Sequence, residues 1–271
     1  MAAVANGRVL NVGPSPDRKD DHTPERATAC GHLRAIDPPE RADLRADWYT
    51  VRDQGKTGSC VGWALADSVM WRQLVAAERL GPEQRLSPRF MWMAAKEMRA
   101  KLTEVKGEPA WRPSTFLEQG MTDVKSALDV ARLYGAALED ELPFDDGLFE
   151  GPIEQFYDSA AQRRITHYYR LDPDEDVSAT WFLHWRRWID QNGPVLVVVT
   201  VDRAFIDGPD VLDEYDAASA SFNHAAALVG YSRNGFLVRC SWGEDWGQDG
   251  YALATEAYLE RAMIESYGVV V

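Results

Sequence analysis

The first half of the chain carries apolar residues at helical spacing. After Ser59-Cys60 the apolar positions share one helix face, at Leu65, Val69 and Leu74. Ser59 is a suitable N-cap for this helix, and Gly81-Pro82 is predicted to end it. A second helix is predicted to open at Ser87-Pro88, and a third to span residues 122–134. The front half is therefore expected to be mostly helical.

The second half changes to the β-branched runs and turn signals of strands. One more helix is predicted over residues 178–191, and the run VLVVVTV at 195–201 predicts a buried strand by its length and composition. Asn234-Gly235 is a hairpin signal between two further apolar runs. Strands are therefore predicted at 224–231, 236–241 and 250–255.

This order of elements predicts an α+β fold with two lobes, with helices first and antiparallel strands second. The helical lobe is placed at about 48–155 and the β lobe at about 156–271, with a cleft between them as the natural place for a site. Residues 1–47 are rich in Pro, Asp and Arg and cannot make a core alone. They are expected to form an extended N-terminal segment, with packed structure beginning near Trp48.

Charge and composition exclude several classes of protein. The 271 residues carry a formal net charge of −14, whereas a nucleic-acid-binding protein normally shows a basic face. The same charge disfavours docking on an anionic membrane. No apolar run reaches the roughly 18 residues of a membrane-spanning helix, and the first residues do not read as a secretory signal. Neither a nucleic-acid nor a membrane partner is predicted, and the oligomeric state stays open.

Cysteine usage points to a reducing compartment. The chain has three cysteines, whereas a secreted disulfide scaffold usually has more and an even number. A cytoplasmic protein is therefore expected. No His/Cys cluster has the spacing of metal ligands, and no glycine-rich phosphate loop is present, so no metal and no cofactor are predicted.

The segment DQGKTGSC, at 53–60, places a thiol at the start of a helix. Unpaired amide N–H groups and the positive end of the helix macrodipole favour a thiolate at Cys60. The same N–H groups can stabilise an oxyanion that forms beside the sulfur, and the side-chain amide of Gln54 is a second candidate donor. A free cysteine is more often a small buried hydrophobe, so the assignment depends on a partner base.

His224 is the candidate base. It opens the apolar strand of the segment NHAAALVGY, at 223–231, where it can face a cleft rather than the core. A cysteine nucleophile needs such a partner to form an ion-paired thiolate and to protonate the leaving amine. A third segment, SWGEDWGQDGY, follows at 241–251.

These three segments resemble the papain-like (C1) cysteine peptidases, and the prokaryotic-type branch in particular. Similar chains of that branch read DQG and GSC, then LSPRF, then NSWG, WG and GY, and residues 86–90 here read LSPRF. Gly193-Pro194-Val195 is similar to the family's strand entry into the second lobe. Pro16-Asp17-Arg18 and Asp43-Leu44-Arg45 are similar to its N-terminal features. The resemblance covers nearly the whole chain in the expected order.

The resemblance implies a role for each matching residue. Cys60 would be the nucleophile, His224 the general base and acid, and Gln54 an oxyanion donor beside the backbone N–H of Cys60. Trp242 would shield the histidine from water. Trp242 and Asn223 are also expected to border the bound substrate, which the resemblance implies is a peptide or protein.

Three positions depart from the family's pattern. Thr57 stands where many secreted members have a disulfide cysteine, and Val61 replaces the aromatic residue that often follows the nucleophile. Cys240 stands where the family has an asparagine that accepts a hydrogen bond from the histidine. A thiol is a poorer acceptor than an amide oxygen, so Cys240 is expected to hold His224 less firmly and to be buried and chemically quiet.

Three functions fit these residues, and the predicted one is hydrolysis of a peptide bond through an acyl-thioester on Cys60. A transpeptidase or ligase would pass the acyl group to an amine instead, with identical chemistry at Cys60. A pseudopeptidase would bind peptides without cleaving them. Only the presence of Cys240 in place of asparagine favours that last alternative.

Overall fold

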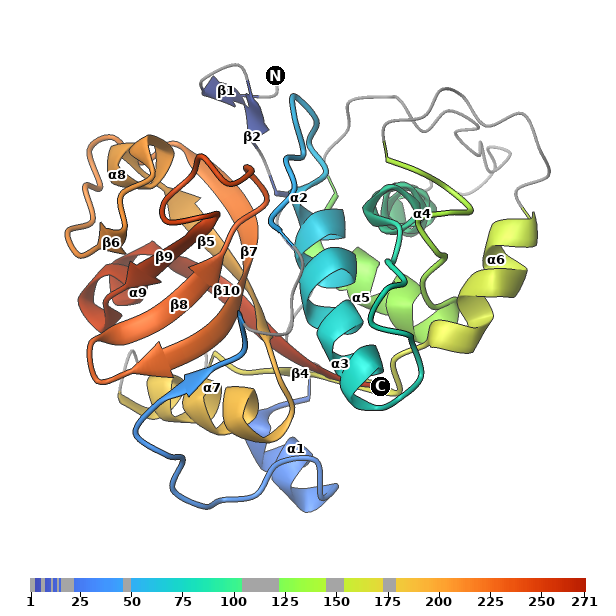
Figure 1. The fold of residues 1–271 in the computed structure, drawn as a ribbon, viewed down its shortest axis with the longest axis horizontal. Coiled ribbons are helices and arrows are strands. Elements are labelled where there is room, and N and C mark those ends of the chain that lie inside the picture. The colour runs from blue at the N-terminus through green and yellow to red at the C-terminus, as the bar shows by residue number, and fades with distance from the viewer. Residues whose placement is uncertain are drawn as a thin grey trace.

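The computed structural model describes residues 3–5, 8–10, 12–13, 15, 22–45, 50–103, 122–144, 154–172 and 179–271. Figure 1 shows a helical lobe beside a β lobe, with the helix that begins at Cys60 running between them. The predicted α+β class, with helices first and the sheet second, is confirmed. None of the described helices has the length and hydropathy of a membrane span.

The central helix of the helical lobe is continuous but changes its winding. It consists of α2 (Cys60–Gly62), a π-helical stretch η2 (Trp63–Met70) and α3 (Trp71–Ala76). The helix ends at Ala76 and not at the predicted glycine-proline pair. It ends there because Glu78 takes a left-handed φ of 56° and the N–H of Arg79 bonds back to the carbonyl of Leu74.

The remaining helices of this lobe begin and end at recognisable signals. Ser87 caps the next helix as predicted, because its Oγ accepts the N–H of Phe90 at 3.0 Å. Gly135 follows the third helix with a φ of 92°, and a Cβ there would lie 1.9 Å from the carbonyl oxygen of Ala160. The elements are α4 (Pro88–Thr103), α5 (Val124–Leu133), α6 (Glu154–Ala160) and the 3-10 turn η3 (Ala161–Arg163).

The β lobe is built on one twisted sheet, whose strand order in the described residues is β4-β10-β5-β7-β8-β9-β6, with β3 also paired to β7. The pairs are antiparallel, as predicted, except that β6 runs parallel to β9. The strands are β3 (Ala42–Asp43), β4 (His167–Arg170), β5 (Val195–Val201), β6 (Val211–Leu212), β7 (Phe222–Ser232), β8 (Gly235–Arg239), β9 (Tyr251–Ala254) and β10 (Met263–Val270).

The two faces of β7 serve different cores. Ala225 and Ala227 belong to the hydrophobic core shared with the helical lobe, whereas Ala226 and Leu228 belong to a second core behind the sheet. His224 lies opposite Val199 of β5 in the antiparallel register. The helices of this lobe are α7 (Ala179–Gln191), α8 (Arg203–Asp207) and α9 (Glu256–Ala262).

The N-terminal segment is more structured than the predicted extended chain. It contains the hairpin β1 (Ala3–Ala5) and β2 (Arg8–Leu10), and the helix α1 (Pro24–Ala29). The prediction was wrong at α1 because this segment does not need a hydrophobic core of its own. Ala27 and Leu33 are buried in the hydrophobic core of the β lobe. In Figure 1 α1 lies next to α7.

Parts of the N-terminal predictions lie outside the described residues. These are Pro16-Asp17-Arg18 and Trp48. Asp43, of the other N-terminal motif, lies in β3 and pairs with Gly230 of β7. The proposed division into lobes at about residue 156 stays a prediction.

Candidate active site

Cys60 is the first residue of α2 and is buried, with 1% of its surface exposed. Ser59 takes the N-cap position, as predicted, but its side chain makes no capping bond. Its Oγ instead lies 2.6 Å from the Thr57 Oγ1. The N–H groups of Cys60 and Val61 are therefore left to interact with the thiol.

The thiol of Cys60 reaches the strand that carries the candidate base. It also interacts with the backbone N–H of Ala225, the residue after His224 in β7. Helix α2 packs directly on β7. The fold thus places the helix that begins at Cys60 against the strand that carries His224.

The ionisation state of Cys60 differs from the prediction. Burial raises the pKa of its thiol to about 11, although the backbone N–H groups of Ala225, Val61 and Cys60 act in the opposite direction. Burial therefore opposes the expected resting thiolate. The prediction counted the amide groups and the helix macrodipole, which favour the anion, but a sequence does not show how completely the thiol is removed from water.

His224 is fully buried under aromatic side chains. The ring of Trp242 lies 4.7 Å from the imidazole, centroid to centroid, so it covers the histidine as the resemblance implied. Phe205 of α8 packs on the same imidazole at 5.7 Å and edge-on against Trp242 at 5.3 Å. Sequence reasoning missed Phe205, because it lies in a short helix outside every recognised segment.

Cys240 occupies the place that its position in the sequence predicted. Its Sγ lies 3.4 Å from Nε2 of His224, and the residue is buried. A sulfur atom therefore stands where the family has an amide oxygen beside the imidazole. This contact is weaker than an N–H to oxygen bond, so packing under Trp242 contributes more of the orientation of His224.

Gln54 is held between the two loops of the site. Its Oε1 accepts from the Ser241 Oγ at 2.6 Å, its Nε2 donates to the carbonyl of Thr57 at 2.8 Å, and its backbone N–H donates to the carbonyl of Ser241 at 2.8 Å. One N–H of the amide has no further partner among the described residues and can serve an oxyanion. No role was predicted for Ser241, although it opens the recognised segment at 241–251.

Asn223 lies beside this site but is already engaged. It is half-buried opposite Thr200 in the register of β5 and β7, and its Oδ1 accepts from the Thr200 Oγ1 at 3.5 Å. Its role in substrate binding stays a prediction. The described part of the chain contains no group of three potential metal ligands.

Comparisons of sequence agree with this arrangement. The family profile described as "Papain family cysteine protease" matches residues 124–270, just over half of the chain, a stretch that contains His224 but not Cys60. Cathepsin J of Mus musculus is 26% identical over 230 residues, which are 80% of this chain and 60% of that protein. Cathepsin J of Rattus norvegicus matches with the same identity and coverage. The chain thus spans about 60% of the length of these curated relatives.

Comparisons of structure show the fold. Xylellain, a cysteine protease from Xylella fastidiosa, superposes with a TM-score of 0.74 and 20% identity over 99% of both chains. Digestive procathepsin L 3 of the Tenebrio molitor larval midgut gives a TM-score of 0.63 with 16% identity, over 88% of this chain and 72% of that chain. With a family profile that matches more than half of its length, this chain belongs to the papain family of cysteine proteases.

Proposed function

We propose that this protein is a cysteine peptidase that cleaves peptide or protein substrates through an acyl-thioester on Cys60. The observation that supports the proposal is the packing of α2, which begins at Cys60, against β7, which carries His224. Membership of the papain family supports the same chemistry. A peptidyl epoxide or chloromethyl ketone tests it, since mass spectrometry should find one adduct, on Cys60.

The proposed reaction starts from the neutral thiol. Burial disfavours the thiolate of Cys60, so the proton passes from Cys60 to His224 as the sulfur bonds to the carbonyl carbon. The carbonyl oxygen becomes an oxyanion, which accepts from the N–H of Cys60 and from Nε2 of Gln54. His224 then gives its proton to the leaving amine, and water, deprotonated by the same imidazole, releases the acid and restores the thiol.

The alternative acceptor is an amine instead of water. Such a transpeptidase or ligase would use Cys60 and His224 in the same way, and no observation in the structure favours it. Incubation of a peptide substrate with and without an added amine separates the two, since only transfer yields a product heavier by the amine. We propose hydrolysis as the main reaction.

The pH dependence of alkylation tests whether the resting thiol is neutral. Only the thiolate reacts with iodoacetamide, so a thiol with a pKa of about 11 should react slowly at pH 7. Its rate should then rise about tenfold for each pH unit up to roughly pH 10. Cys30 is exposed and serves as the internal reference. If Cys60 reacted faster than Cys30 at pH 6.5, the thiolate would already exist at rest.

Replacement of Cys240 tests how His224 is oriented. Cys240→Asn restores an amide oxygen near Nε2 of His224. Turnover should therefore lie between the parental value and about ten times that value, since a gain of about tenfold corresponds to one good hydrogen bond. Cys240→Ala should lose less than about tenfold, because Trp242 still covers the imidazole. Steady-state kinetics on both variants measure this. Complete loss of turnover in Cys240→Ala would make Cys240 a participant in the reaction.

A further inference from the structure

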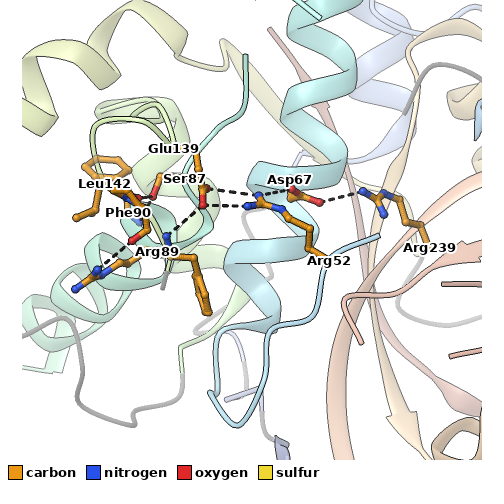
Figure 2. Close-up of polar contacts among 10 residues, drawn as sticks. Arg52, Asp67, Ser87, Arg89, Phe90, Glu139, Leu142 and Arg239 are labelled. Atoms are coloured by element: carbon orange, nitrogen blue, oxygen red, sulfur yellow. Dashed lines mark hydrogen bonds and ion pairs between the residues drawn. The ribbon is translucent and has the colours of Figure 1, made fainter. Parts of the chain in front are cut away.

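Four charged residues form a continuous chain across the junction of the two lobes (Figure 2). Asp67 accepts from Nη2 of Arg52 at 2.8 Å with one carboxylate oxygen and from Nη2 of Arg239 at 3.0 Å with the other. Nη1 of Arg52 donates to Glu139 at 3.0 Å. Glu139 also accepts the backbone N–H of Phe144 at 3.2 Å, which fixes the outer end of the chain in the helical lobe.

The centre of this chain is removed from water. The side chain of Arg239 is 0% exposed and that of Asp67 is 4% exposed. Taking two such charges out of water costs about as much as their attraction returns, so a buried pair is a poor device for stability alone. What a buried pair does supply is a fixed geometry, because each charge has only one place where it is compensated.

The members of the chain come from the segments that carry the catalytic groups. Arg52 lies two residues before Gln54, and Arg239 lies directly before Cys240 at the end of β8. Asp67 lies seven residues after Cys60, in the π-helical stretch of the same helix. A π-helical stretch is rare and turns side chains to directions that an α-helix does not give them. The carboxylate of Asp67, on the helix that begins at Cys60, thus binds both the loop of Arg52 and Gln54 and the end of β8, where Arg239 leads into the loop of Cys240.

Backbone bonds join these two loops to each other. Residues 53 and 242 form an antiparallel bridge. The N–H of Gln54 donates to the carbonyl of Ser241 at 2.8 Å, and the N–H of Gly243 donates to the carbonyl of Arg52 at 3.3 Å. The joined loops carry Gln54 and Cys240, whereas Cys60 begins the helix. The two bonds to Asp67 tie these joined loops to the body of the helix that begins at Cys60.

We propose that Asp67 is a positioning residue, which with Arg52 and Arg239 sets the spacing between Cys60 and the groups on the joined loops. This inference rests on the proposed function. Arg52 also stacks on Trp63 of the same helix, with its guanidinium carbon 4.6 Å from the ring centroid, so its position is fixed from a second side. Loss of these ion pairs should let the two lobes move apart at the site, while the helix that begins at Cys60 stays intact.

Asp67→Asn tests this, because it keeps the size of the side chain and removes its charge. Two changes are expected, one in turnover and one in the reactivity of the thiol. Turnover of a peptide substrate should fall on the order of 10²-fold, since a displacement of about 1 Å costs that much, with little change in KM. The midpoint of the Cys60 alkylation profile should move down from about 11 toward the ordinary thiol value of about 8.5, because water reaches the sulfur. Thermal unfolding confirms that the variant is folded at the assay temperature.

Two further variants keep the test decisive. Arg52→Lys retains the charge but a single ammonium cannot reach both Asp67 and Glu139, so it should shift both readouts in the same directions, and it tests the proposal if Asp67→Asn does not fold. Asp172→Asn is the matched control, because it breaks another buried ion pair. Asp172 accepts from Arg170 at 3.0 Å, and the side chains of Arg170 and Asp172 are 7% and 5% exposed. This substitution should lower stability and leave kcat and the alkylation midpoint unchanged.

The outcomes separate this inference from the proposed function. A folded Asp67→Asn or Arg52→Lys variant with parental kcat and alkylation midpoint would overturn the positioning role. Equal changes in Asp172→Asn would also overturn it, because they would reflect lost stability alone. If the parent itself cleaved no peptide, the proposed function would fail. The shift of the alkylation midpoint would still test whether the four charged residues hold the two lobes together.

Discussion

Replacing Cys60 with alanine should abolish peptide cleavage. The acyl-thioester cannot form without the sulfur, and loss of a nucleophile in a comparable serine peptidase, subtilisin, lowers kcat on the order of 10⁶-fold. The change removes one buried atom and leaves a cavity that costs about 1 kcal/mol, so the fold should persist. Progress curves on a fluorogenic peptide, with circular dichroism as the check on folding, measure both.

The control variants identify the nucleophile among the cysteines. Cys240 also contacts His224, and its Sγ at 3.4 Å from Nε2 makes it the rival thiol. If Cys60 is the nucleophile, Cys240→Ala keeps turnover within about tenfold of the parent and Cys30→Ala retains all of it. Cleavage at the parental rate by Cys60→Ala, combined with loss in Cys240→Ala, would reverse the assignment.

The parts of the fold that were predictable are those that local pattern determines. The strand at 195–201 was placed at its observed bounds because a run of β-branched residues has few alternatives, and Ser87 was identified as a cap from its position before Pro88. The early end of the Cys60 helix was not predictable, since it depends on a left-handed Glu78. Helix α1 was missed because its buried face packs against residues far away in the chain.

The candidate site divides in the same way. Cys60, His224 and Gln54 stand in segments whose resemblance to the family is direct, and Cys240 was placed beside His224 by alignment with the family's asparagine. Apart from Trp242, the groups that hold them carry no local signal. Phe205 packs on the imidazole and Asp67 bridges the lobes only because the tertiary fold brings distant elements together. The effect of burial on the pKa of Cys60 could not be predicted for the same reason, since desolvation is a property of the packed site.

Gln54→Ala should lower kcat on the order of 10²-fold to 10³-fold, the usual cost of one oxyanion donor, with little change in KM, because the oxyanion exists only in the transition state. Gln54 also ties the two loops through Ser241, so part of the loss could come from displacement of those loops. Ser241→Ala separates the two causes, since it removes the tie at Oε1 and leaves the amide nitrogen in place. Steady-state kinetics should show a fall of less than about tenfold in Ser241→Ala, the worth of one hydrogen bond.

If the two variants lost equal amounts of kcat, Gln54 would act only by holding the loops together. A parental kcat in Gln54→Ala would reduce it to a turn residue, leaving the backbone N–H of Cys60 as the donor.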